Sequence, residues 1–183
     1  MKHHFIFLLL AAGIISACTG SNKSGKEELS AYATGKTVLK AFSDTVKLDT
    51  FKVVLNGDEP KNMVMTFTIT AHDGSQIYMR AFKATDLIDN YQSTLELKKE
   101  SKQKKFITEE YNLFFEDENF LEPAVTENEN PDENTPDKDF FNELKQSGLN
   151  GFQYRLSNEN KVYIAWSSKE RKVLPYYSCC KQK

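Results

Sequence analysis

The chain of 183 residues is poor in the residues that build many catalytic and metal centres. It has three histidines, and because His3 and His4 stand at the start, the remainder contains only His72. A zinc site with several histidine ligands is therefore excluded there, and any Ser-His-Asp or Cys-His mechanism would need His72 itself. His72 lies in the sequence AHDGS, which is typical of a hairpin turn, so we interpret it as a solvated turn residue.

Several other signatures are also missing from the sequence. There is no glycine-rich phosphate loop and no GxSxG, CxxC or HExxH motif. The net charge is -2, without the basic surplus of nucleic-acid-binding domains. We therefore expect no cofactor, no metal, no nucleic acid and no catalytic residues. The alternative, an enzyme, would need polar groups clustered in a cleft around His72 or Asp86.

Only one long apolar run is present, and it lies at the N-terminus. Phe5 to Ile15 carries no charge, and eleven helical residues would extend only about 16 Å, against a hydrocarbon core of roughly 30 Å. Lys2 precedes the run, and the small residues Ser16 and Ala17 follow it. This pattern predicts a secretory signal peptide over residues 1–17. The alternative is a buried core helix.

The end of this run, Ile15-Ser16-Ala17-Cys18, resembles the lipobox of bacterial lipoproteins. The resemblance implies cleavage before Cys18, a diacylglycerol on its thiol and acylation, as by palmitate, of the new amino group. Several acyl chains matter because a single chain anchors a protein only marginally. The alternative is an ordinary cysteine beside an ordinary cleavage site.

The residues after Cys18 bear on location. In enterobacteria an Asp after the lipidated cysteine retains the protein in the inner membrane, and here Thr19 takes that place. No acidic cluster of the kind used for surface export follows directly. By this analogy we expect an outer-membrane lipoprotein facing the periplasm. Residues 18–28 form the lipidated cysteine and a flexible tether, and residues 29–183 form a single domain.

Two adjacent cysteines, Cys179 and Cys180, stand near the C-terminus. Neighbouring Cα atoms lie about 3.8 Å apart, below the usual range for a disulfide of roughly 4.4–6.8 Å. A bond between them would therefore be strained. We leave open three interpretations: no specific function, a disulfide of some kind, and redox or metal chemistry.

The clearest structural pattern is a β-hairpin. Met63 to Ala71 alternates in period two, Asp73-Gly74 is a strong turn signal, and residues 77–82 continue on the other side. Further strands are expected at residues 152–156, 162–166 and 173–177, with the last at a sheet edge because Pro175 cannot donate a hydrogen bond. The class predicted is α+β, mainly an antiparallel meander with one or two short helices.

The helices are less clearly marked. The apolar spacing in Leu29 to Phe42 allows a short helix. Thr135-Pro136-Asp137 predicts a helix start with Thr135 as cap, and Gly148 its end. Leu95 to Leu97 and Phe106 to Phe115 are expected to be strands. The lysine-rich segment between them is interpreted as a solvated turn, and a membrane- or nucleic-acid-binding patch is the alternative.

Residues 116–139 are strongly acidic, with ten carboxylates against one lysine. Three prolines in the segment, Pro123, Pro131 and Pro136, predict an exposed, disordered loop. Calcium binding is the alternative, but Pro136 occupies a ligand position and the loop glycine is missing.

Three hypotheses for function remain. The first is a lipid-anchored, non-enzymatic interaction or scaffolding module with an envelope protein as partner, using the aromatic pairs Phe114-Phe115 and Tyr176-Tyr177 as a contact surface unless they pack in the core. The second is a binding protein for a small or lipidic ligand held between sheet and helix, and the third is the enzyme. In overall style the body resembles small lipoproteins of uncharacterised function in Bacteroidota, which implies no activity.

Overall fold

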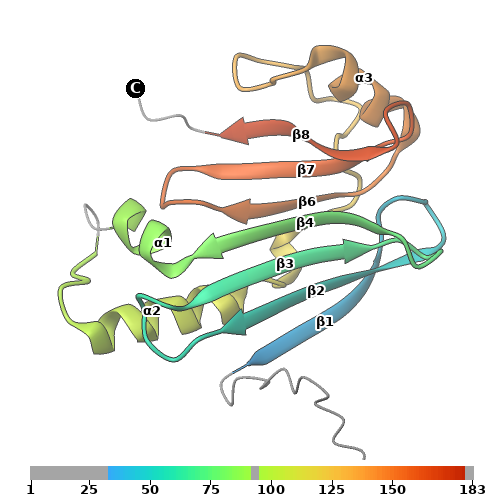
Figure 1. Cartoon of the computed structure of the whole chain (residues 1–183). Coiled ribbons are helices and arrows are strands. Elements are labelled where there is room, and N and C mark those ends of the chain that lie inside the picture. Colours follow the sequence, from blue (N-terminus) through green and yellow to red (C-terminus); the bar gives the residue numbers. More distant parts are fainter. Residues whose placement is uncertain (1–32, 92–94, 180–183) are drawn as a thin grey trace, which may run out of the picture.

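The computed structural model describes residues 33–91 and 95–179, which form two antiparallel sheets of four strands each (Figure 1). The strands of the first sheet follow one another in chain order, as β1 (Thr34–Ala41), β2 (Leu48–Asn56), β3 (Val64–Thr70) and β4 (Gln76–Lys83). The second sheet has the order β5 (Phe120–Leu121), β6 (Gly151–Arg155), β7 (Lys161–Ser167) and β8 (Lys172–Cys179). The helices are α1 (Ala84–Tyr91), α2 (Glu100–Leu113), the 3₁₀ turn η1 (Asp117–Asn119) and α3 (Lys138–Ser147).

The predicted class, α+β with mainly antiparallel sheet, is confirmed, although the described ranges contain three α-helices instead of one or two. None of these helices combines the length and hydrophobicity that a membrane crossing requires. The expected signal peptide, Cys18, the tether up to residue 28 and Cys180 lie outside the described residues.

The predicted hairpin is formed by β3 and β4. Gly74, with a φ of 89°, makes its turn, and the Gly74 N–H donates to the Ala71 carbonyl at 2.8 Å. Along β3 every second residue, including Met65, Phe67 and Ile69, is buried. This alternation buries one face of the first sheet and leaves the other toward solvent.

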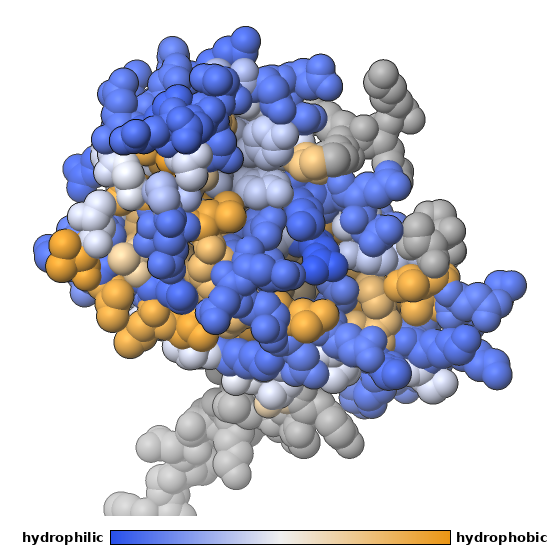
Figure 2. Space-filling model, turned by 180° about the vertical axis from the view of Figure 1, so that it is seen from behind, coloured by the Kyte–Doolittle hydropathy of each residue, from blue (hydrophilic) through white to orange (hydrophobic). Residues whose placement is uncertain are grey.

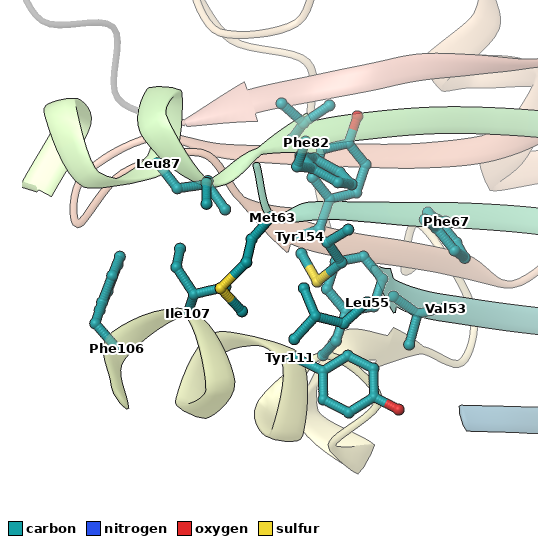
Figure 3. Packing of buried hydrophobic residues seen from close by; sticks show 14 of the residues in the cluster. Val53, Leu55, Met63, Phe67, Phe82, Leu87, Phe106, Ile107, Tyr111 and Tyr154 are labelled. Atoms are coloured by element: carbon teal, nitrogen blue, oxygen red, sulfur yellow. The ribbon is translucent and has the colours of Figure 1, made fainter. Parts of the chain in front are cut away.

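The main core lies between the buried face of the first sheet and the second sheet. Phe51 and Phe67 from the first sheet meet Phe152 from β6, with ring centroids 5.5 and 5.1 Å from that of Phe152. Figure 3 shows Ile107 and Tyr111 of α2 beside Met63 and Leu55. Phe106 of the same helix packs against Tyr91 of α1, with ring centroids 4.8 Å apart. Helix α2 thus completes the core on the same face of the first sheet.

A second, smaller core lies on the other face of the second sheet, which α3 covers. Phe140, Phe141 and Leu144 of α3 pack with Ala165 of β7 and Tyr176 of β8. In Figure 1, α3 and the loop before it lie over this sheet, on the opposite side of the molecule from α1 and α2. The second sheet is therefore covered on both faces.

The lysine-rich segment is a helix, so the prediction of a turn between two strands is wrong. Glu, Lys and Gln have high helix propensity, and Phe106, Ile107 and Tyr111 share the buried face of α2. The lysines take the solvent side, where Lys105 pairs with Glu109 at 3.5 Å. Leu95 to Leu97 forms no strand, although Leu97 is buried.

The short helix expected within residues 29–42 is also wrong over its described part, since residues 34–41 form β1 along the edge of the first sheet. The run from Thr34 to Ala41 contains three β-branched residues, Thr34, Thr37 and Val38. β-Branched residues favour extended backbone. Pairing with β2 over the full length of β1 outweighs the weak helical spacing.

The acidic segment 116–139 is largely exposed, as predicted, but parts of it pack against the rest of the protein. It contributes η1 and β5, and it buries Ala124 and Val125 against α3 and the second sheet.

The helix predicted after Thr135 is α3. It ends at Gly148, whose φ of 64° is the left-handed conformation that glycine adopts readily. Its cap is Asp137 and not Thr135, because the Asp137 carboxylate accepts from the N–H groups of Asp139 and Phe140 at 2.9 and 3.0 Å.

Candidate functional site

The most distinctive surface hollow is a cleft of about 330 Å³ between the acidic segment and the second sheet. We call it the tyrosine cleft. Its lining residues are Leu121, Ala124, Val125, Glu129, Asn130, Asp132, Phe141, Tyr163, Tyr176 and Tyr177. This volume lies at the lower end of the range of small-ligand sites. The cleft brings together two features of the sequence, the acidic segment and the tyrosine pair near the C-terminus.

A β-bulge places both neighbouring tyrosines on the cleft side of β8. Tyr163 of β7 faces Tyr177, and the next residue, Ile164, faces Pro175, so that Tyr176 is the extra residue. In a regular strand Tyr176 and Tyr177 would point to opposite faces. Pro175 has no N–H for the ladder, which makes this a natural place for the irregularity.

Two of the three tyrosine hydroxyls hold the acidic segment against the sheet. Tyr176 donates to the Ala124 carbonyl at 2.8 Å, and Tyr177 donates to the Asp132 carboxylate at 3.0 Å. The Ser178 N–H on the free edge of β8 donates to the Asn134 carbonyl at 3.1 Å. The Tyr163 hydroxyl makes no hydrogen bond to the part of the chain that is described.

The charged side chains that line the cleft are two carboxylates, Glu129 and Asp132. The backbone N–H of Asn134 donates to Asp132 at 2.8 Å and lowers the pKa of this carboxyl below its usual value, with the Tyr177 hydroxyl acting in the same direction. The Glu129 carboxylate accepts from the Thr126 N–H and hydroxyl at 2.6 and 2.8 Å. Both charged residues of the lining are acidic, so the lining contributes negative and no positive side chains to the cleft.

The positions of Tyr176 and Ala124 in the cleft wall depend on a neighbouring residue without a side chain, Gly151. A Cβ at Gly151 would lie 2.9 Å from the Tyr176 hydroxyl oxygen and 3.0 Å from the Ala124 Cβ. Glycine is therefore needed here for the close approach of β6 to the tyrosine and to the acidic segment.

Two other hollows are weaker candidates. A wider one of about 490 Å³ lies beside α3, but its Glu143 carboxylate is occupied by the Ser168 N–H at 2.9 Å and by the buried Ser167 hydroxyl at 3.2 Å. The other, of about 20 Å³, lies between α2 and β6 and has room for about one water. Burial raises the pKa of Glu110 there, while Arg155 opposes the shift.

The candidate catalytic residues do not come together. His72 lies in the turn before β4, Asp86 lies exposed in the first turn of α1 after β4, and the length of β4 separates them. His72 instead donates its backbone N–H to Asp49, a fully buried carboxylate, at 2.8 Å. Among the described residues no group of three or more His, Cys, Asp or Glu side chains is placed to hold a metal ion.

The aromatic pairs divide between core and surface. Phe114 is buried and Phe115 packs against the main core, so this pair serves packing. Tyr176 is buried in the second core, and Tyr177 is half-buried at the cleft. Cys179 takes part in a disulfide, and Cys180 lies outside the described residues, so the role of this pair of cysteines stays open.

Figure 2 shows apolar side chains on the back of the molecule in patches that polar residues separate. The most exposed large apolar side chains, Val46, Met79 and Leu39, come from the first sheet and its loops. Single exposed apolar residues are ordinary on protein surfaces.

The arrangement of the tyrosine cleft fits binding better than catalysis. Its carboxylates hold the loop and its tyrosines shape the walls. Burial raises the pKa values of Tyr163 and Tyr177 above the ordinary phenol value, which is the opposite of what activation of a phenol as a base would need. No protein-family model, curated protein sequence or solved structure matches this chain.

Proposed function

We propose that this chain is a lipid-anchored lipoprotein of the cell envelope, on the outer membrane and facing the periplasm, that works as a non-enzymatic binding module. The anchor rests on the resemblance of Ile15 to Cys18 to a lipobox. The binding role rests on one observation, the tyrosine cleft, which combines aromatic walls with carboxylates at its rim. Aromatic residues are enriched at the centres of binding surfaces.

The alternative, a binding protein for a small or lipidic ligand, is supported in its small-ligand form only. The cleft is lined partly by Phe141 of α3 and partly by the sheet, and its volume suits a small molecule. A lipid chain would need a continuous apolar cavity. The interior between the first sheet, the second sheet and α2 is instead filled by side chains (Figure 3).

The anchor is tested by replacing Cys18 with serine in the full-length protein. We expect the wild type in the membrane fraction, with an intact mass that includes the acyl chains, because two or three chains hold a protein firmly to a bilayer. The Cys18→Ser variant should be uncleaved or soluble. Cys180→Ser is the matched control and should stay with the membrane. A wild-type Cys18 with a bare thiol in a freely soluble protein would refute the anchor.

The binding role is tested by photo-crosslinking in native envelopes. A photoreactive residue at Asn130, exposed at the cleft, should give a discrete crosslinked product, and the same residue at Thr37, exposed on β1, should not. A product from Thr37 alone, or from neither position in a folded and membrane-bound protein, would count against the cleft as the binding surface.

A further inference from the structure

We infer that the tyrosine cleft recognises an organic cation, namely a substituted ammonium group on a short aliphatic body. This inference rests on the binding role proposed above and specifies its ligand class. The chemistry is shared by free ammonium compounds and by lysine side chains of another protein. Three independent properties of the lining support it: charge, ring geometry and the balance of donors and acceptors.

The charge of the lining has one sign. Glu129 and Asp132 are anionic, and no lysine or arginine lines the cleft. Lys145 of α3 donates its ammonium to the Glu129 backbone carbonyl at 2.8 Å and is not part of the lining. Electrostatic attraction in a partly enclosed cleft therefore favours a positive ligand and opposes an anion.

The rings stand at steep angles to one another. Tyr163 and Tyr177 have centroids 5.3 Å apart and an interplanar angle of 87°, and Tyr163 and Tyr176 are 6.1 Å apart at 72°. A sugar or a nucleobase stacks best on a flat platform, which these rings do not provide. These are edge-to-face contacts, in which the edge of one ring meets the face of the other. A compact cation would use a ring face that such a contact leaves open, because the π face attracts positive charge.

The polar groups of the lining mainly accept hydrogen bonds. The Tyr176 and Tyr177 hydroxyl protons are already donated to Ala124 and Asp132. What remains for a ligand is largely carboxylate and phenol oxygen, with the Tyr163 hydroxyl and the Asn130 amide as the donors. A primary ammonium group donates to these oxygens, and a quaternary ammonium group, which has no N–H, is attracted to them by charge. Both match this set better than a carboxylate or phosphate, which would need hydrogen-bond donors.

The inference is tested with the full chain in a non-ionic detergent, by calorimetric titration with choline and with its neutral isostere 3,3-dimethylbutan-1-ol. The two probes share their shape and differ in charge. We expect choline to bind at least about tenfold more tightly. The assignment would be overturned if neither choline nor the lysine peptide described below bound the folded wild type more tightly than its neutral counterpart at millimolar concentration.

Variants locate the binding. Glu129→Gln combined with Asp132→Asn keeps hydrogen-bond acceptors while it removes both charges, and should weaken choline binding about tenfold or more. Glu127→Gln combined with Glu133→Gln removes two charges from the same segment outside the lining, and should change affinity less than twofold. Tyr163→Ala should weaken binding and Tyr163→Phe should preserve it, because the π face is retained. Equal losses in both charge pairs would show a general charge effect and refute the site.

A third probe separates the two sources of ammonium. The capped tripeptide acetyl-Gly-Lys-Gly-amide is compared with choline, and its norleucine counterpart is the neutral control. Preference for the lysine peptide assigns the cleft to a protein partner, and preference for choline assigns it to a free compound. If neither cation exceeds its neutral control while crosslinking from Asn130 persists, the ligand class fails and the binding role stands.

Discussion

Replacing Phe67 with alanine should lower the free energy of unfolding by about 3–5 kcal/mol. Phe67 is 0 % exposed at the centre of the main core. Its ring centroid lies 5.1 Å from those of Phe114 and Phe152 and 5.5 Å from that of Tyr78. Removing it would leave a cavity between the two sheets and α2 that the surrounding rings cannot close without changing their packing.

A loss of this size would be a large part of the total free energy of unfolding of a small domain, which is about 5–15 kcal/mol. Urea unfolding followed by circular dichroism measures the change. Phe67→Leu should cost less than Phe67→Ala, since it leaves a smaller cavity. Met79→Ala, on the exposed side of neighbouring β4, should change stability by less than about 0.5 kcal/mol. If Met79→Ala and Phe67→Ala lowered the free energy of unfolding by similar amounts, the placement of Phe67 in the main core and of Met79 at the surface would be refuted.

The part of the first sheet that could be predicted from sequence is the part with a local sequence pattern, the β3–β4 hairpin. β3 alternates strictly, and Asp73-Gly74 marks the turn, so both the hairpin and its buried face follow from a dozen residues. β1 could not be predicted this way, because the edge strand is stabilised by its ladder with β2. Pairing between strands overrides weak local spacing.

Helix α2 shows a different limit. Its first half has no apolar periodicity, and Phe106 to Phe115 is rich in residues that also favour strands. The spacing of Phe106, Ile107 and Tyr111 fits a helical face, but the pattern becomes decisive only when the first sheet offers an uncovered apolar surface. A short apolar run is ambiguous until its packing partner is known.

The tyrosine cleft lay beyond sequence reasoning for a geometric reason. The sequence marks the acidic segment and the pair Tyr176-Tyr177, but regular alternation would send one tyrosine away from the segment. The bulge beside Pro175 turns both toward it. Pro175 was the available signal, and it indicated an edge strand without indicating where the extra residue would fall.

The second large effect is expected at Asp49, which no sequence pattern distinguishes from the exposed carboxylates. Asp49 is 0 % exposed, and its two oxygens accept from different loops. One bond comes from the Ser43 N–H at 2.6 Å in the β1–β2 connection, and the other from the His72 N–H at 2.8 Å in the β3–β4 turn. A buried carboxylate is tolerated only when hydrogen bonds replace its water, so these two bonds fix the two connections to each other.

Asp49→Ala should therefore lower the free energy of unfolding by about 2–4 kcal/mol, because it leaves two backbone N–H groups without acceptors. Asp49→Asn should cost less, since one amide oxygen can still accept from one of them. Asp44→Ala is the control. This carboxylate of the same connection accepts from the Val46 and Lys47 N–H groups at the surface, and its loss should cost less than either Asp49 variant. Hydrogen exchange at Ser43 and His72 should accelerate in Asp49→Ala and stay unchanged at Phe152. Unchanged protection at both amides would show that Asp49 does not hold these connections.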